Sequence, residues 1–303
     1  LMVLNDVVYF VGEFQHINGS TSRLRAAAVG VDGVARPWNP AADNTIETLF
    51  AVGNRVYLGG DFGMVGGVSR QRLAAVDTTL GAVETSFAPT VTGSNASVIR
   101  VDVLGDTVFF GGTFSMVNGS SRSNAAAVKG APGTGDDGTL LGWNPNVGGP
   151  VYDIDAFDDD VYLAGGFSSV GGSSRPGIAM VDALAAGGAL RVWRPVDVAG
   201  GSVSVIDASD TAVLFGGLLY DLNYLYIGAV LYPEAGLPGV PAAPTTPRAR
   251  VRASALTIDW GAPPLGARPS SYVIEAGTGP GLSNIARAAT GTTATTLSAA
   301  GLG

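Results

Sequence analysis

A segment of about fifty residues recurs along this 303-residue chain, and the repetition constrains the fold more than any other feature. Its clearest part is an apolar stretch that contains glycine and aligns without gaps in five copies: Val8 to Phe14, Val56 to Phe62, Val108 to Phe114, Val161 to Phe167 and Val213 to Leu219. The shared glycines are 48, 52, 53 and 52 residues apart: Gly12, Gly60, Gly112, Gly165 and Gly217. Such a period indicates one supersecondary unit used repeatedly.

Two further positions recur after the glycine in each good copy. An arginine follows each good copy of the motif, at Arg23, Arg70, Arg122 and Arg175. The unit then closes with an aromatic residue two positions before a proline, at Trp38, Phe87, Trp143 and Trp193. The fifth copy has lost both the arginine and the closing aromatic residue.

Each unit is predicted to form four short strands. In the second copy these span Ile46 to Val52, Val56 to Phe62, Arg72 to Asp77 and Ala82 to Phe87, and the first turn carries residues that tolerate a left-handed backbone. The second strand is apolar on both faces, so both faces must be covered. Radial stacking of sheets does this, and the pattern therefore predicts an all-β chain with a β-propeller of four-stranded blades, of which about five copies are visible.

With these residues in view, the repeat resembles the bacterial delta-60 repeat family. Ser115 to Arg122 (SMVNGSSR) and Glu84 to Pro89 (ETSFAP) follow that family's pattern closely. The resemblance covers about residues 1–200 and extends more weakly to 236. It implies a β-propeller of unknown molecular function and supplies no information on an active site. Kelch repeats are the alternative, although Val29, Val76, Val128 and Val181 stand where kelch repeats carry tyrosine.

The composition changes near residue 240. Residues 1–240 hold 12 basic and 23 acidic groups, whereas 241–303 hold 5 and 2. Beyond Pro241, the stretches Ala255 to Trp260 and Ser271 to Gly277 resemble the start of a fibronectin type III module, a partial immunoglobulin-like β-sandwich. The predicted domains are a propeller over 1–236, with copies at about 1–40, 41–92, 93–148, 149–197 and 198–236, and a C-terminally truncated module over 237–303. The chain is interpreted as a fragment of a longer polypeptide.

Composition excludes several classes of protein. Hydrophobic residues make up 46% and charged residues 14%, the opposite of the balance that keeps a chain disordered. A net charge of −8 without a basic stripe argues against a nucleic-acid partner. There is no cysteine, which removes disulfides and thiolate chemistry. The apolar window 211–231 carries Asp221 and Asn223 at its centre, so no membrane span is predicted.

Few residues are candidates for metal binding or catalysis. His16 is the only histidine, which argues against a Ser-His-Asp triad or a multi-histidine metal site, and it is interpreted as a loop substitution. The cluster Asp153, Asp155, Asp158, Asp159 and Asp160 is interpreted mainly as a solvated turn. Carboxylates are nevertheless ligands that Ca²⁺ prefers, so Asp155, Asp158 and Asp160 are weak calcium candidates. No catalytic residue and no cofactor is assigned.

The repeated residues have both a structural and a functional interpretation. Arg23, Arg70, Arg122 and Arg175 would form a ring that either binds anions or pairs each guanidinium with an acid or an aromatic ring. Their presence in every good copy favours the structural role. Asn18, Asn95 and Asn118 match the glycosylation acceptor pattern but are interpreted as turn residues, and Asp136 and Asp137 lie in an insertion interpreted as a longer hairpin loop.

The sequence thus favours a non-catalytic extracellular or cell-surface scaffold that presents propeller loops to a protein or glycan ligand. The alternatives are a non-catalytic portion of a secreted carbohydrate-active enzyme, or a propeller hydrolase or lyase that uses channel carboxylates. A quinone-dependent propeller dehydrogenase is a further alternative for which no ligands are identified. Enzymatic activity, the number of blades, the ligand and the oligomeric state stay open at this stage.

Overall fold

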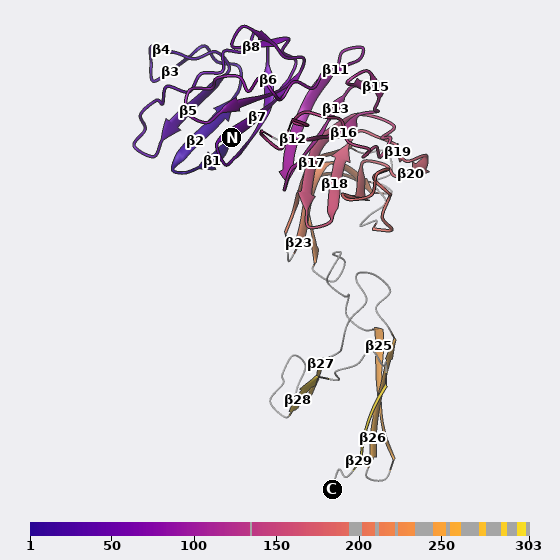
Figure 1. Ribbon diagram of the computed structural model, residues 1–303. Helices are drawn as coiled ribbons and strands as arrows, with labels where there is room; N and C mark the ends of the chain where they lie inside the picture. Colours follow the sequence, from indigo (N-terminus) through magenta and orange to yellow (C-terminus); the bar gives the residue numbers. More distant parts are fainter. Residues whose placement is uncertain are drawn as a thin grey trace. The chain divides into compact units, whose positions relative to one another are not determined.

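The computed structural model describes residues 1–133, 135–193, 202–209, 212–221, 224–233, 245–252, 255–261, 273–276, 286–289 and 296–300 (Figure 1). Regular structure in these ranges consists of antiparallel strands, and no helix occurs among them. The predicted all-β class is therefore confirmed. The chain divides into two compact units, one formed by Leu1–Ala208 with Leu214–Val230 and the other by Ser209–Val213 with Leu231–Gly303.

Each copy of the repeat forms one three-stranded sheet in the first unit. We number these sheets 1 to 5 in chain order: β1 (Met2–Leu4), β2 (Val7–Val11) and β5 (Ala26–Gly30); β6 (Ile46–Val52), β7 (Arg55–Gly60) and β10 (Leu73–Asp77); β12 (Ser97–Leu104), β13 (Thr107–Thr113) and β16 (Ala125–Lys129); β17 (Val151–Phe157), β18 (Asp160–Gly165) and β21 (Ile178–Asp182); β22 (Ser202–Ala208), β23 (Ala212–Asp221) and β24 (Tyr224–Pro233). The glycine-containing strand is central in every sheet.

The predicted fourth strand is reduced to a single bridge in sheets 1 to 4. In sheet 2, Val83 pairs with Val76, and the Glu84 amide donates to the Ala75 carbonyl, but no ladder continues. The reason lies in the repeated arginine, because the Arg70 guanidinium donates to the carbonyls of Glu84 and Thr85. The equivalent bridges join Val29 to Ala35, Val128 to Leu140 and Val181 to Leu190.

The turns follow the sequence pattern. Asn5, Asp6 and Asp158 have φ values of 49°, 60° and 56° in the hairpins that precede the central strands. Asn18 and Asn118, at φ 47° and 49°, start the tight turns of small two-residue hairpins, so the interpretation of these residues as turn residues holds. Four such hairpins pair β3 (His16–Ile17) with β4 (Thr21–Ser22), β8 (Met64–Val65) with β9 (Val68–Ser69), β14 (Met116–Val117) with β15 (Ser120–Ser121) and β19 (Ser169–Val170) with β20 (Ser173–Ser174). Strand β11 (Val91–Thr92) pairs with β14 and extends the third hairpin to three strands.

The hydrophobic core lies between successive sheets. Three clusters of buried side chains fill the spaces between sheets 1 and 2, 2 and 3, and 3 and 4. The first strands also contact one another in chain order, because β12 packs against β6 and β17, and β17 packs against β22. We call β1, β6, β12, β17 and β22 the inner strands. In sheets 2 to 4, the two apolar faces of the central strand, inferred from the sequence, are thus covered by two neighbouring sheets.

The repeated glycines Gly60, Gly112 and Gly165 lie where the inner strand crosses the central strand at a bulge. A Cβ atom on Gly112 would lie 2.0 Å from the Ser97 carbonyl oxygen, and one on Gly165 would lie 2.1 Å from that of Pro150. The β12–β13 register shifts between Val98 and Arg100 beside Gly112, and the β17–β18 register shifts in the same way beside Gly165. Glycine at this position therefore permits a bulge with close backbone contact.

A substitution tests this requirement. We expect Gly112→Ala to lower the free energy of unfolding by at least about 2 kcal/mol, because overpacking against rigid backbone is costly. Gly187→Ala is the control, since a Cβ there meets no atom within 4 Å. Urea unfolding of both variants gives the comparison, and equal midpoints for Gly112→Ala and Gly187→Ala would show that the bulge does not need glycine.

The second unit contains two small sheets. The first joins β25 (Thr245–Arg252), β26 (Ala255–Gly261) and β29 (Thr296–Ala300), and the second joins β27 (Val273–Ala276) and β28 (Ala286–Ala289). Strands β26 and β27 occupy the two stretches from which a sandwich module was predicted. The identity of that module stays a prediction.

Candidate functional site

The inner strands carry a column of equivalent side chains. In the register of the repeat, Asp102, Asp155 and Asp207 occupy the same position on β12, β17 and β22, and Phe50 and Met2 occupy it on β6 and β1. The spacing of 53 and 52 residues between the aspartates matches that of the repeated glycines. We call these residues the inner column. Sequence reasoning did not identify Asp102 or Asp207, although the repeat period alone would have aligned them with Asp155.

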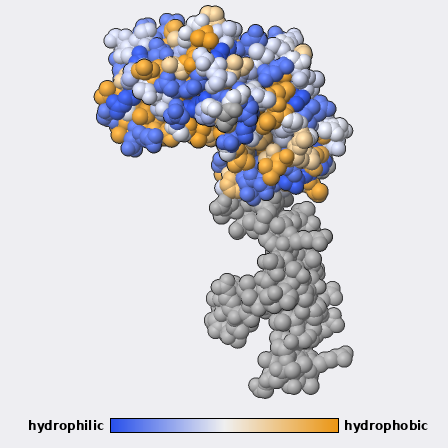
Figure 2. Space-filling model, in the orientation of Figure 1, coloured by the Kyte–Doolittle hydropathy of each residue, from blue (hydrophilic) through white to orange (hydrophobic). Residues whose placement is uncertain are grey.

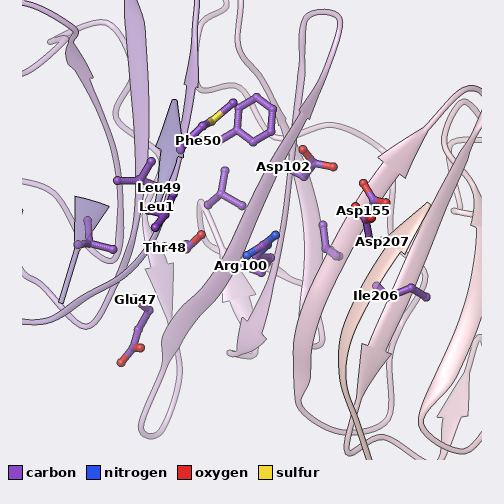
Figure 3. Close-up of a pocket in the computed structure, with 14 residues that line it drawn as sticks. Leu1, Glu47, Thr48, Leu49, Phe50, Arg100, Asp102, Asp155, Ile206 and Asp207 are labelled. Carbon is purple, nitrogen blue, oxygen red and sulfur yellow. The ribbon is translucent and has the colours of Figure 1, made fainter. Parts of the chain in front are cut away.

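The inner column faces a pocket of about 290 Å³ (Figure 3). The labelled side chains Glu47, Arg100 and Asp207 reach it from three different inner strands, and Phe50 adds an aromatic wall. The complete lining is Leu1, Met2, Val11, Glu47, Thr48, Leu49, Phe50, Arg100, Val101, Asp102, Ile154, Asp155, Ile206 and Asp207. All five inner strands therefore contribute to one mostly polar pocket.

The acids on these strands link β12 to β17 and β17 to β22. Asp102 Oδ2 accepts a hydrogen bond of 2.6 Å from the Ala156 amide, and the Asp155 carboxyl accepts one from the Ala208 amide. Asp153 Oδ2 accepts a hydrogen bond of 2.8 Å from the amide of Ile206. The described inner strands share no β-ladder with one another, so these side chains supply hydrogen bonds between neighbouring inner strands.

In the first two copies, the inner-column position carries Met2 and Phe50 in place of an aspartate. The Ala51 amide lies 3.0 Å from Met2 Sδ, which takes the place of the carboxylate between sheets 1 and 2. Phe50 has no acceptor and packs against the core between sheets 2 and 3, while the Val103 amide bonds to Asp102 Oδ1 within sheet 3 at 2.8 Å. The inner column therefore meets the next sheet as a hydrogen-bond acceptor at Met2, Asp102 and Asp155 and through apolar packing at Phe50.

Burial changes the acidity of these groups. Desolvation is the main cause that raises the pKa of Asp155 to about 7; the nearby charges of Asp102 and Asp207 and a hydrogen bond with Asp102 add to it, and the Ala208 amide opposes it. Desolvation also raises the pKa of Asp102 and of Asp153, and the Arg100 guanidinium, 2.9 Å from Asp153 Oδ1, opposes the shift of Asp153. Asp102 and Asp155 share a hydrogen bond, so their protonation steps belong to the pair and not to either carboxyl alone.

The three calcium candidates lie in different parts of the structure and in different surroundings. Asp155 belongs to the inner column, Asp158 lies on an exposed hairpin turn, and Asp160 Oδ1 lies 2.6 Å from Arg191 Nε. In the described part of the chain, no group of three or more His, Cys, Asp or Glu side chains is arranged to hold a metal ion. His16 is exposed in β3, a two-residue strand.

The repeated arginines bind the backbone of their own sheets. Arg23 donates to the Arg36 carbonyl at 2.7 Å, and Arg122 donates to the Leu141 carbonyl at 2.8 Å. Each also bonds the carbonyl of the residue before it, as Arg70 and Arg175 do. The expected structural role thus uses carbonyl oxygens of the closing segment instead of acids or aromatic rings.

The closing aromatic residues connect each sheet with the next. Trp38 Nε1 donates to the Asp77 carbonyl of sheet 2, and Trp143 Nε1 donates to the Asp182 carbonyl of sheet 4, both at 2.9 Å. The indole rings of Trp38, Trp143 and Trp193 each pack edge-on against an aromatic ring of their own central strand. The phenyl ring of Phe87 does the same with Tyr57 but has no N–H to donate.

A buried ion pair lies at the interface where that N–H is missing. Arg55 of sheet 2 forms two hydrogen bonds of 2.9 Å with Asp137, which lies in the insertion of the third copy. Their side chains are 3% and 1% exposed, Ser86 Oγ donates to Asp137, and the guanidinium lies over Tyr57 and Phe87. The insertion predicted as a hairpin loop therefore provides an inter-sheet contact. Sequence reasoning missed the pair because its members are 82 residues apart.

The described part of the chain contains no helix long and apolar enough to cross a membrane. No protein-family model matches the sequence, and no curated protein matches it. Among solved structures, the chain is similar to the crystal structure of the computationally designed Ika8 protein, with 12% sequence identity and a TM-score of 0.38. That match covers 82% of this chain and 86% of the other.

Proposed function

We propose that the chain is a non-catalytic binding scaffold of the β-propeller type, at the cell surface or secreted, with a protein or glycan as ligand. In this proposal sheets 1 to 5 are blades of the delta-60 kind, and the second unit is a spacer related to fibronectin type III modules. The sheet order and the packing of inner strand against inner strand support the proposal, because blades of a propeller stack in this manner.

One observation carries the functional part of the proposal. The buried charged groups form contacts between or within sheets: Asp102 and Asp153 bind amides of the next sheet, and Arg55 binds Asp137. Their hydrogen-bonding capacity is used by the fold. The groups that remain open to solvent around the pocket are Glu47, Arg100 and Asp207 on the inner strands, next to Phe50.

These groups suit a small polar unit. A pocket of about 290 Å³ with one aromatic wall and both signs of charge fits one sugar ring or one polar side chain of a protein ligand. When the full chain is tested on an array of cell-wall glycans and surface proteins, it should therefore bind at least one of them and should not cleave it. Arg100→Gln should weaken retention, whereas the exposed Leu184→Gln should not. Cleavage of the bound glycan would contradict the proposal.

A second candidate function rests on Asp155 alone. A carboxyl with a pKa of about 7 beside other acids is the arrangement of a general acid in a glycoside hydrolase. If the pocket is catalytic, Asp155→Asn should abolish hydrolysis of a glycan and preserve its binding. The scaffold proposal predicts that neither the wild type nor the variant cleaves any glycan on the array.

A further inference from the structure

A second pocket, of about 410 Å³, lies away from the inner column, between segments of the second and third copies. The closing segment of the second copy lines it with Ser86 and Ala88, the β14–β15 hairpin with Ser120, and the insertion of the third copy with Gly138 and Thr139. The closing segments bridge to the third strand of a sheet, whereas the inner strands lie at the opposite edge. We call this the outer pocket.

Hydrogen bonds and close packing hold the walls of the outer pocket in place. Asn118 Nδ2 donates to the Gly138 carbonyl at 3.2 Å, and Asn118 Oδ1 accepts from the Thr90 amide at 2.8 Å. A Cβ atom on Gly138, which has a φ of 79°, would lie 3.1 Å from the amide nitrogen of Ala88. The three segments are therefore fixed against one another before a ligand binds, which lowers the cost of binding.

The outer pocket lies where the sequence departs from the repeat. Phe87 and Ala88 close the second copy, where the first and third copies carry tryptophan and asparagine, at Trp38 and Asn39 and at Trp143 and Asn144. The small Ala88 side chain leaves room in the pocket wall, and Asp137 belongs to an insertion that the second copy lacks. Insertions in single repeats often map to the binding face of a repeat protein. These departures therefore indicate a use that the other copies do not share.

The pocket wall offers hydroxyl groups and no net charge. Among the described residues that line it, Asp137 alone is ionisable, and the guanidinium of Arg55 neutralises its carboxylate through two hydrogen bonds of 2.9 Å. Ser120 and Thr139 are exposed, and within the part of the chain that the structure describes their hydroxyls have no hydrogen-bond partner. A hydroxyl both donates and accepts, as the hydroxyls of a sugar do. The lining therefore favours an uncharged, hydroxyl-rich ligand.

A protein partner fits the outer pocket less well than a sugar. The residues that carry most of the binding energy between proteins are enriched in tryptophan, tyrosine and arginine, whereas serine and threonine are under-represented among them. On the face of the first unit that Figure 2 shows, hydrophobic residues are interspersed with hydrophilic ones, unlike the broad apolar patch that marks an extensive protein interface.

We propose that the outer pocket binds an uncharged sugar residue of a glycan, independently of the pocket beside the inner column. The hydroxyls of Ser120 and Thr139 exchange hydrogen bonds with sugar hydroxyls, and Ser86 Oγ, which donates to Asp137, accepts one more. Ala88 contacts the carbon–hydrogen edge of the sugar ring. The volume lies within the range of about 300 to 1,000 Å³ that small-molecule sites occupy.

Titration of the full, isotope-labelled chain with neutral disaccharides tests the proposal by amide chemical shifts in NMR spectra. The probes are cellobiose, lactose and mannobiose, with digalacturonic acid as the charged counterpart. We expect at least one neutral disaccharide to shift the amide signals of Ser120 and Thr139 in a saturable manner. Digalacturonic acid should leave both signals unchanged, because the outer pocket has no free cation to bind a carboxylate.

Four variants locate the binding. Ser120→Ala should weaken it about twofold to tenfold, the effect of one lost hydrogen bond. Ala88→Asn should abolish it, because it restores the larger residue of the first and third copies. Ser173→Ala is the matched control, since Ser173 is the equivalent exposed serine in β20 of sheet 4. Arg100→Gln, which changes the pocket beside the inner column, should also bind as the wild type does.

The outcomes that overturn the proposal are distinct from those that concern the inner column. Absence of saturable shifts with all three neutral disaccharides overturns it, and so does equal affinity of Ala88→Asn and the wild type. Loss of binding in Arg100→Gln with full binding in Ser120→Ala overturns it too, because that result places the sugar beside the inner column. Well-dispersed amide spectra confirm that each variant is folded.

Discussion

Asp137→Ala is expected to lower the free energy of unfolding by about 3 to 5 kcal/mol, the cost typical of removing one partner of a buried ion pair. The side chain of Arg55 is 3% exposed and has Asp137 as its bidentate partner, with Glu84 at 3.6 Å. The variant would leave the guanidinium in the interface between sheets 2 and 3 without its main counter-charge. Chemical unfolding monitored by tryptophan fluorescence measures the loss.

Two further variants show whether the loss comes from the pair. Asp6→Asn changes an exposed carboxylate on a hairpin turn and should shift stability by less than about 0.5 kcal/mol. The double variant Arg55→Met with Asp137→Leu should lose less than Asp137→Ala alone, because an apolar pair leaves no buried charge. If the double variant is as unstable as the single one, the insertion contributes through its shape and not through the ion pair.

Stability is expected to fall as the pH rises through about 7, because Asp155 is more basic in the folded protein than in the unfolded chain. A raised carboxyl pKa means that the folded state holds the proton more tightly, so this contribution is largest below the unfolded pKa of about 4 and is lost above the folded value of about 7. At about 1.4 kcal/mol per pKa unit, the difference of roughly three units corresponds to an upper limit of about 4 kcal/mol.

Asp155→Asn isolates this contribution. An asparagine amide resembles the protonated carboxyl, since it can accept from the Ala208 amide and donate to Asp102. The variant should match the wild type near pH 4 and exceed it in stability near pH 8. Asp158→Asn is the control, because Asp158 lies on an exposed turn where asparagine tolerates the positive φ. A wild-type difference between pH 4 and pH 8 that persists in Asp155→Asn would place the titrating group elsewhere.

The sequence predicted those parts of the fold that depend on local pattern. The inner strand Ile46–Val52 matches its predicted bounds, and the turns at Asn5 and Asp158 have the left-handed backbone that their residue types indicate. Repeated glycines marked the bulge because only a missing Cβ lets the Ser97 carbonyl approach Gly112. The predicted fourth strand forms no ladder because the Arg70 side chain binds the Glu84 and Thr85 carbonyls, which a ladder would use.

The candidate site was harder to predict for a physical reason. Its acids are spread over β12, β17 and β22, so their proximity depends on how the sheets stack and not on any short motif. The sequence places a local cluster from Asp153 to Asp160, yet Asp155 bonds to the next inner strand, Asp158 lies on an exposed turn and Asp160 pairs with Arg191. The repeat period contained the missing information, because it places Asp102, Asp155 and Asp207 in one column.

The central claim is that inner-column carboxylates join sheet 3 to sheet 4 and sheet 4 to sheet 5. Amide hydrogen exchange at residue resolution in wild type and Asp102→Ala tests it most directly. We predict that the variant loses protection at the Ala156 amide, one sheet further along the chain, and keeps it at Ala208, which Asp155 binds. Unchanged exchange at Ala156, or equal loss at both amides, would contradict the account.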